Sequence, residues 1–327
     1  MIQIAIMGLG TVGTGVAKVV AENARQIERK LGEPLQVKTI LVRHFKDGPY
    51  RQLMTDDFTK IEEDHAIRVV VETIGGTRFA YPYVKACLES GRSVCTSNKE
   101  MVATYGAELL ALAKEHDCAF LFEASVGGGT PIITPMHQCL AANVITEVEG
   151  IVNGTTNFIM DAMARQGADF PAVLQRAQEL GYAEADPSAD IDGDDIRRKL
   201  TISANIAFDA LLREEDIPAF GIRTVTGADV ADFRAHGFTC KLLACAQRTE
   251  TGVAAYVEPA LVAEGEPEAA VPGNYNLISC TGELLGRQSY FGQGAGRYPT
   301  AANVVQDCLD LLTGEDGFYT ETARPMA

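Results

Sequence analysis

The stretch IQIAIMGLGTVGTGVAKVV, residues 2–20, begins as an apolar run, continues through the motif G-x-G-x-x-G and ends in a helical pattern. This order of strand, glycine turn and helix is the context that a dinucleotide-binding fingerprint requires. Gly8 allows the tight turn, Gly10 lets the backbone approach a pyrophosphate, and Gly13 lets the helix pack against the strand. The helix start adds free N–H groups and the positive end of a helix dipole. We therefore predict that the chain begins with a Rossmann-type domain that binds NAD or NADP.

Apolar runs and helical patterns alternate through the first 130 residues. The runs typical of strands lie at 35–43, 67–76, 92–99 and 118–125, and the helical patterns at 81–91 and 100–116. This alternation predicts a doubly wound parallel sheet of the α/β class, whose ligands bind at the carboxyl ends of the strands. One such end carries Thr96, Ser97, Asn98 and Lys99. These residues can bind a nicotinamide or its ribose and offer a cation to a substrate, or Ser97 or Asn98 can simply cap the next helix.

The second predicted strand ends in the basic sequence Arg43-His44-Phe45-Lys46. NAD-specific proteins place an acid at this point, where it binds the ribose 2′-hydroxyl, whereas a basic end favours a 2′-phosphate. The sequence therefore predicts some preference for NADP(H) over NAD(H). The alternative is a solvated basic turn, because Asp47 offsets part of the charge.

Length and composition exclude several classes of function. A chain of 327 residues exceeds the size at which a single core stops growing, so we expect two domains with a cleft between them. The net charge of −16, from 28 basic and 44 acidic residues, argues against binding to nucleic acid or to an anionic membrane. The eight cysteines form no C-x-x-C pair, and no signal peptide or membrane-spanning run is found, so we expect a cytoplasmic protein.

The segment GYAEADPSADIDGDDIRRKL, residues 181–200, places six carboxylates before three basic residues. A calcium-binding EF-hand loop starting at Asp190 is excluded, because Asp195 stands where that loop needs glycine. From Asp194 onward the pattern is helical, which places Asp195 and Lys199 on one face of the helix. The pair can point into a cleft and take part in chemistry, or it can be a common surface ion pair.

Two further segments follow the last strand of the first domain. FEASVGGGTPIITPM, residues 122–136, carries three consecutive glycines, whose carbonyls can turn toward a cation or another ligand or which can form a hinge. EGIVNGTTNFIM, residues 149–160, places Asn153, Gly154 and Thr155 between a strand and a helix.

Together these segments resemble the homoserine dehydrogenase family. The fingerprint, the NK segment, the E-A-x-V-G-x-G-x-P-I-I and N-G-T-T-N-F/Y-I segments and the acidic loop with a final lysine occur in family order. GQGAGRYPTAANVVQD, residues 292–307, matches the family's closing segment, so the resemblance extends from residue 3 to about residue 312. It implies reversible hydride transfer between L-homoserine and L-aspartate 4-semialdehyde, in the biosynthesis of threonine, methionine and isoleucine. It also implies NAD(P)(H), a sodium or potassium ion and a homodimer.

The resemblance implies a division of the chain and a set of site residues. Residues 1–130 with 292–327 would form the dinucleotide-binding domain, and residues 131–291 a mixed α/β domain for substrate binding and dimerisation. The catalytic residues would be Lys199 as proton donor, Asp195 as its orienting partner and Lys99 at the junction of cofactor and substrate. The substrate contacts would be Gly154, Thr155, Glu184, Asp190 and Asp195, with Glu184 meeting the substrate ammonium.

The resemblance implies cofactor and cation contacts as well. The cofactor contacts would be Gly8, Gly10, Thr11, Val12, Gly13, Arg43, Thr73, Ile74, Thr96, Ser97, Asn98, Lys99 and Gly294. The cation ligands would be Glu123 and the carbonyls of Val126, Gly128 and Thr130. Such hard oxygen ligands suit an alkali cation.

The sequence departs from the family pattern at two points. Asp194 stands where relatives carry an apolar residue and adds a carboxylate beside Asp195. Many relatives carry a carboxyl-terminal ACT regulatory domain, for which no residues remain after 327, so inhibition by threonine through such a domain is not expected unless the chain continues.

Two rival functions are considered. One rival is a phosphorylating semialdehyde dehydrogenase, which needs a cysteine nucleophile in a turn that Cys95 lacks. The other is a non-catalytic nucleotide-sensing Rossmann protein, which would not need Lys199.

Overall fold

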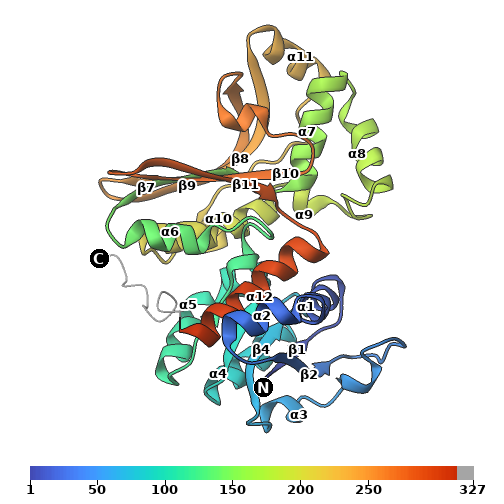
Figure 1. Ribbon diagram of the computed structural model, residues 1–327. Coiled ribbons are helices and arrows are strands. Elements are labelled where there is room, and N and C mark those ends of the chain that lie inside the picture. Colours follow the sequence, from blue (N-terminus) through green and yellow to red (C-terminus); the bar gives the residue numbers. More distant parts are fainter. Residues whose placement is uncertain (315–327) are drawn as a thin grey trace. The chain divides into compact units, whose positions relative to one another are not determined.

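The computed structural model describes residues 1–314 and separates the chain into two compact units (Figure 1). The first consists of residues 1–131 and the described residues from 295 on, and the second of residues 132–294. Residues 292–294, which we expected in the first domain, belong to the second unit because the chain there completes and leaves a strand of the second sheet. The predicted continuation of the first domain from 315 to 327 lies outside the described residues.

The first unit is built on a parallel sheet in the order β3-β2-β1-β4-β5-β6. This is the doubly wound order, so the predicted α/β class is confirmed. The strands are β1 (Ile2–Met7), β2 (Leu35–Leu41), β3 (Met54–Thr55), β4 (Ile67–Glu72), β5 (Ser93–Thr96) and β6 (Phe120–Leu121). The helices are α1 (Thr11–Glu22), α2 (Ala24–Leu31), α3 (Thr59–Glu62), α4 (Ala80–Glu89), α5 (Lys99–Glu115) and α12 (Arg297–Thr313), with short 3-10 turns η1 (Arg51–Leu53) and η2 (Glu123–Ser125).

The central strands of this sheet are buried on both faces. Ile4, Ala5, Ile6 and Met7 of β1 are all inaccessible to solvent, which explains why the strand reads as an unbroken apolar run. The helix α12 packs against α1, as the predicted return of the closing segment requires. Gly15 of α1 permits this contact, because a Cβ there would lie only 2.8 Å from the Cβ of Ala301.

The second unit is built on an antiparallel sheet in the order β11-β10-β7-β8-β9. Its strands are β7 (Ile145–Ile151), β8 (Phe238–Thr249), β9 (Gly252–Ala263), β10 (Tyr275–Gly282) and β11 (Gly286–Gln293). Its helices are α6 (Ile133–Leu140), α7 (Gly154–Gln166), α8 (Phe170–Glu179), α9 (Ser188–Ile191), α10 (Asp194–Phe208) and α11 (Gly227–Ala235), with 3-10 turns η3 (Glu214–Asp216) and η4 (Pro267–Ala270). Helices α6 and α10 pack together and against β7 (Figure 1).

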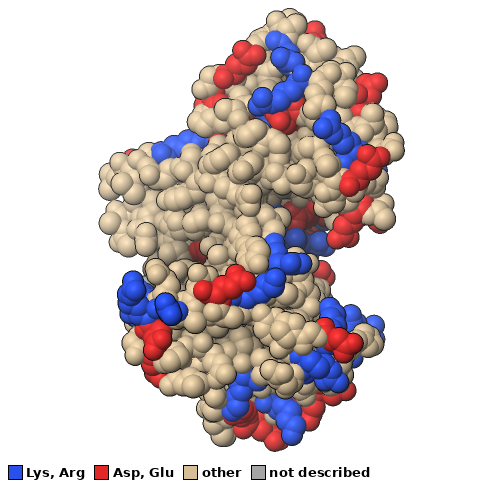
Figure 2. All heavy atoms as spheres, turned by 45° about the vertical axis from the view of Figure 1, so that its right-hand side comes forward, with Lys and Arg blue, Asp and Glu red and all other residues tan. Residues whose placement is uncertain are grey.

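The surface agrees with the charge balance of the sequence. Figure 2 shows basic and acidic side chains interspersed over the face that it presents, with no broad basic field for a polyanion. Within residues 1–314, no helix has both the length and the apolar character needed to cross a bilayer.

Candidate active site

The glycine motif forms the turn between β1 and α1. Gly8 has φ +98°, in the left-handed region that favours glycine, and a Cβ there would lie 2.8 Å from the carbonyl oxygen of Thr73. A Cβ on Gly13 would lie 2.1 Å from the carbonyl oxygen of Gly8, so the helix can approach the turn only without a side chain. A Cβ on Gly10 would meet nothing within 4 Å, which leaves open space beside the backbone at the start of α1. This cradle fits a pyrophosphate held by a helix N-terminus.

The loop after β4 contacts this turn, and the loop after β5 contacts the loop after β4. The Thr73 hydroxyl donates to the carbonyl oxygens of Met7 and Gly8, at 3.2 and 3.0 Å. β1 and β4 are neighbours in the sheet, and the strand order reverses between them, which is where open α/β sheets bind nucleotides. Asn98 caps α5 by accepting from the Met101 N–H at 3.2 Å, and its amide also donates to the Gly76 carbonyl at 2.7 Å. The capping interpretation of this segment is therefore right, and the same side chain also joins the two loops.

The basic end of β2 contacts the glycine turn. Lys46 Nζ donates to the carbonyl oxygen of Leu9 at 3.1 Å. Arg43 is exposed, and its guanidinium lies 5.6 Å from the ring centroid of Phe79. Arg78, which sequence reasoning missed, lies 5.2 Å from the same ring. Two guanidinium groups thus gather at one aromatic ring, an arrangement able to bind a phosphate and stack on a base.

Lys199 and Asp195 form a buried ion pair on α10. Lys199 Nζ lies 2.9 Å from Asp195 Oδ2, and the two residues are only 7% and 5% exposed. Lys199 also donates to the carbonyl oxygen of Val152 at 2.6 Å, just beyond the end of β7. The helical spacing was predicted correctly, but the burial excludes the surface ion pair that the spacing alone left open. A buried charge pair with fixed partners is a candidate for catalysis.

Asn153 connects this pair to a second carboxylate. Its Nδ2 donates to Asp190 Oδ1 at 2.7 Å and to Asp195 Oδ2 at 2.8 Å, while its Oδ1 caps α7 by accepting from the Thr156 N–H at 2.9 Å. Sequence reasoning noted the position of Asn153 but gave it no role. An asparagine at a helix N-cap is a recognisable signal, but its second task depends on residues 37 and 42 positions away.

Asp190 is half-buried at the end of α9. Burial raises its pKa, and the negative charge of Asp195 adds to this shift, while the hydrogen bond from Asn153 and the charge of Lys199 oppose it. Thr155, a predicted substrate contact, donates its hydroxyl to the Tyr182 carbonyl at 2.6 Å. The cluster therefore offers one ammonium that can give a proton and two carboxylates that can receive a cationic group.

The glycine-rich turn after β6 is buried and rich in oxygen ligands. Glu123 is almost inaccessible, and the Thr130 hydroxyl is buried with no hydrogen-bond partner within residues 1–314. The Gly128 carbonyl accepts from Asn303 of α12 at 2.8 Å, and the carboxylate of Asp307 accepts from the Glu123 N–H at 3.1 Å. Burial, reinforced by the charge of Glu123, raises the pKa of Asp307 well above its usual range. An unsatisfied hydroxyl and a buried carboxylate in the same turn fit the predicted cation.

Comparisons with known proteins agree over most of the chain. Residues 131–309 match the family model described as "Homoserine dehydrogenase", and residues 8–123 match "Homoserine dehydrogenase, NAD binding domain". The chain belongs to the homoserine dehydrogenase family. The homoserine dehydrogenase of Bacillus subtilis is 37% identical over 316 residues, which are 95% of this chain and 73% of that protein.

Solved homoserine dehydrogenases share the fold. The crystal structure of the enzyme from Thiobacillus denitrificans superposes with a TM-score of 0.92 at 39% identity, covering 97% of this chain and 74% of that one. A hyperthermophilic archaeal homoserine dehydrogenase in complex with NADPH superposes with a TM-score of 0.81 at 26% identity, covering 99% of both chains.

Not all residues that the homoserine dehydrogenase resemblance implied gather in one cluster. Glu184 is exposed, and within residues 1–314 no hydrogen bond or ion pair joins its carboxylate to the Lys199 cluster. Asp194 pairs with Arg197 at 2.7 Å, so the extra carboxylate turns to a cation of its own. A Cβ on Gly294 would lie 1.8 Å from Asn276 Nδ2, which places this predicted cofactor residue against β10 in the second unit.

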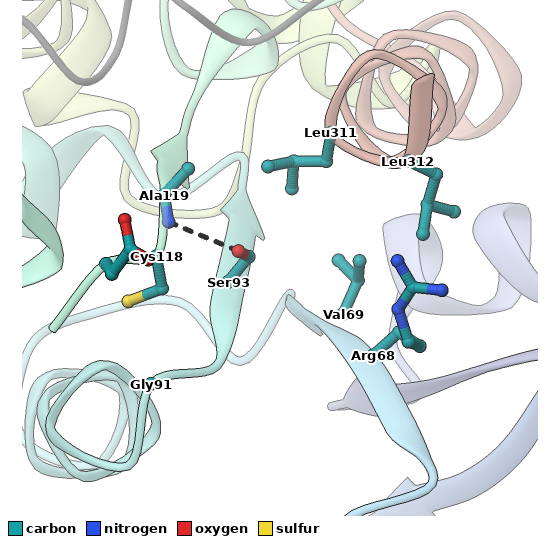
Figure 3. Close-up of a pocket in the computed structure, with 9 residues that line it drawn as sticks. Arg68, Val69, Gly91, Ser93, Cys118, Ala119, Leu311 and Leu312 are labelled. Atoms are coloured by element: carbon teal, nitrogen blue, oxygen red, sulfur yellow. Dashed lines mark hydrogen bonds between the residues drawn. The ribbon is translucent and has the colours of Figure 1, made fainter. Parts of the chain in front are cut away.

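A cavity of about 320 Å³ in the first unit contains none of the predicted site residues (Figure 3). It lies at the amino ends of β4 and β5, lined by Arg68, Val69, Gly91, Ser93, Asp117, Cys118, Ala119, Leu311 and Leu312. The nucleotide loops leave the opposite, carboxyl ends of the same strands. The cavity is therefore separate from the dinucleotide site of the fold.

Proposed function

We propose that this protein interconverts L-homoserine and L-aspartate 4-semialdehyde with NAD(P)(H), and that Lys199 is its proton donor. The family supports the reaction, and the buried Lys199–Asp195 pair, fixed by Asn153 and the Val152 carbonyl, is the observation that supports the assignment. When bound, the nicotinamide supplies or accepts the hydride. A buried lysine held in this way also argues against a protein that only senses nucleotides.

The residues of the Lys199 cluster are proposed to donate the proton, position the donor and bind the substrate. Reduction of an aldehyde creates an alkoxide, which must receive a proton as it forms, and the ammonium of Lys199 can give it. Asp195 and the Val152 carbonyl hold Nζ in one position, so the proton is delivered to one point. Glu184 is the proposed partner of the substrate ammonium, as the resemblance implies. Asp190, Asp195, Gly154 and Thr155 are further proposed substrate contacts, and Lys99 is a proposed contact of both ligands.

We infer a preference for NADP(H) from the basic end of β2. Arg43 and Arg78 lie over Phe79, and Lys46 contacts the glycine turn through the Leu9 carbonyl. Such a set suits a 2′-phosphate better than a free 2′-hydroxyl. The complex of the archaeal relative with NADPH supports the same cofactor type.

Three further parts of the proposal have separate support. The buried, unsatisfied Thr130 hydroxyl and the buried carboxylate of Glu123 support a sodium or potassium ion at that turn. A homodimer is supported by exposed aromatic side chains on one face of the second sheet, where Tyr256 is 36% and Phe291 53% exposed. A reducing compartment such as the cytoplasm is supported by eight free cysteines.

The direct test is an absorbance assay for the reduced nicotinamide with L-homoserine and NADP⁺ or NAD⁺. We expect turnover with homoserine and none with L-serine, whose hydroxyl is one methylene closer to the ammonium. Nucleotide binding without turnover in either direction would favour the sensing alternative. Phosphate-dependent oxidation of the semialdehyde would instead favour the rival dehydrogenase.

A further inference from the structure

β4 is an apolar strand that ends in a fully buried glutamate, Glu72. Carboxylates are almost never fully buried unless they are paired with a charge. In the described part of the chain, the hydrogen bonds that reach the Glu72 carboxylate all come from neutral groups. Glu72 lies at the carboxyl end of a central strand, where sheets of this kind bind nucleotides, so its burial points to a role beyond packing.

The two carboxylate oxygens of Glu72 bind two different loops. Oε1 accepts from the backbone N–H groups of Ile74 and Gly75, at 2.6 and 3.2 Å. Oε2 accepts from the Thr96 hydroxyl at 2.6 Å. That hydroxyl accepts in turn from the Asn98 N–H at 2.9 Å. Glu72 therefore ties the loop after β4 to the loop after β5.

This connection reaches the glycine turn as well. Thr73, the residue after Glu72, donates its hydroxyl to the carbonyls of Met7 and Gly8. The Asn98 amide closes the ring from the other side through the Gly76 carbonyl. Burial raises the pKa of Glu72, and the same hydrogen bonds oppose this shift, so they favour the ionised form.

We propose that Glu72 is a positioning residue of the cofactor site, which holds the loops after β4 and β5 in the arrangement that receives the nicotinamide half of NADP(H). This inference rests on the proposed function, because it takes Thr73, Ile74, Thr96 and Asn98 as cofactor contacts. An apolar residue of similar size would fill the same space but leave the two N–H groups and the hydroxyl without their acceptor. The loops would then lose their common anchor, while the basic end of β2 would not.

The test compares two ligands, NADPH and 2′,5′-ADP, which lacks the nicotinamide half. Binding of NADPH is followed by its fluorescence and binding of 2′,5′-ADP by calorimetry, without substrate. Glu72→Leu should weaken NADPH binding about tenfold or more and change 2′,5′-ADP binding less than about twofold. Glu72→Gln retains the reach and one acceptor oxygen, so it should weaken NADPH binding only about threefold. Glu72→Asp retains the charge but is one methylene shorter, so it should resemble Glu72→Leu.

Glu268 provides a matched control. It is also a buried, hydrogen-bonded carboxylate, but it lies in the second unit and accepts from Arg287. Glu268→Leu should leave the affinity for both ligands unchanged. Equal losses of NADPH and 2′,5′-ADP in all three Glu72 variants, or unchanged NADPH binding, would overturn the inference. A wild-type protein that binds 2′,5′-ADP but not NADPH would instead overturn the proposed function.

Discussion

The two units carry candidate sites of different construction. In the first unit, backbone loops at the edge of a parallel sheet make the site, and glycines at fixed positions such as Gly8 and Gly13 give these loops their shape. In the second unit, side chains from separate helices make the site: Asn153 precedes α7, Asp190 lies in α9 and Lys199 lies in α10. A loop site is encoded by neighbouring residues, whereas a side-chain site depends on packing. Substitutions in the first unit should therefore change cofactor binding, whereas substitutions in the second should change the rate of the chemical step.

Lys199→Ala should give the largest loss of turnover and should affect only the side-chain site of the second unit. Turnover should fall by about 10² or more, the usual contribution of general acid and base catalysis, because the alkoxide loses its proposed proton donor. NADPH affinity, measured by fluorescence, should stay unchanged, because the glycine turn belongs to the other unit. Lys199→Arg should rescue little, since a guanidinium keeps its proton at any working pH. Near-normal turnover in Lys199→Ala would make Lys99 the first candidate for proton donor.

Asn153→Asp tests whether the side-chain site depends on its bridging amide. The variant retains an oxygen that caps α7, but it places a third carboxylate against Asp190 and Asp195. We expect a loss of roughly tenfold in kcat/KM for homoserine at neutral pH, because repulsion among the acids disorders the cluster. Asn153→Ser, which also caps a helix but adds no charge, is the control. If both variants show the same loss, the shared defect is the missing bridge rather than the added charge.

The difference between the units also sets what the sequence could predict. The doubly wound class of the first sheet and the shared helix face of Asp195 and Lys199 are predicted from local patterns, and both are confirmed. The bridge from Asn153 and the burial of Glu72 could not be predicted, because they depend on which distant segments pack together. Glu184 shows the reverse case. A motif match implies a substrate contact, but its side chain is exposed and, within residues 1–314, makes no hydrogen bond or ion pair with the Lys199 cluster, so that contact stays a prediction.

Arg43→Asp should change cofactor preference in the first unit. The substitution should weaken NADP(H) about tenfold or more and leave NAD(H) nearly unchanged, because only the 2′-phosphate loses a cation and meets an acid. Separate KM values for the two cofactors measure this. Arg51→Asp is the control, since the Arg51 guanidinium lies 4.3 Å from the ring centroid of Phe45, whereas Arg43 lies over Phe79. Equal losses for both cofactors would remove Arg43 from the ribose site.

The proposed cation site at Glu123 should have a smaller effect on turnover than either of the two other sites. Replacing sodium and potassium by tetramethylammonium should lower turnover several-fold, because the bulky ion cannot enter a buried set of oxygens. Thr130→Val removes the unsatisfied hydroxyl and should weaken the response to potassium. Activity that is unaffected by both changes would show that the glycines form a hinge only.

Lys241 should give the smallest effect on activity and a clear effect on stability. This β8 lysine is fully buried in the second unit, where Nζ donates to Asn157 Oδ1 at 2.9 Å and to the Val271 carbonyl at 2.8 Å. Burial lowers its pKa from 10.5 to about 8, while Asp161 opposes and Arg165 adds to the shift. Below about pH 8 the folded and unfolded chains both hold this proton, so Lys241 makes no contribution to the pH dependence of stability there.

Between about pH 8 and 10.5 the unfolded chain holds the proton and the folded chain has lost it, so the free energy of unfolding should rise with pH through this window. Lys241→Met removes this rise and leaves the other titrating groups in place. Urea unfolding of both proteins at pH 7.5, 9 and 10 measures the difference, which should grow in favour of the wild type by about 1.4 kcal/mol per pH unit at most. Curves that stay parallel would mean that Lys241 keeps its proton in the folded chain. The Asn157 and Val271 oxygens would then be sufficient to hold a buried ammonium without a carboxylate, in contrast to Lys199, which has Asp195.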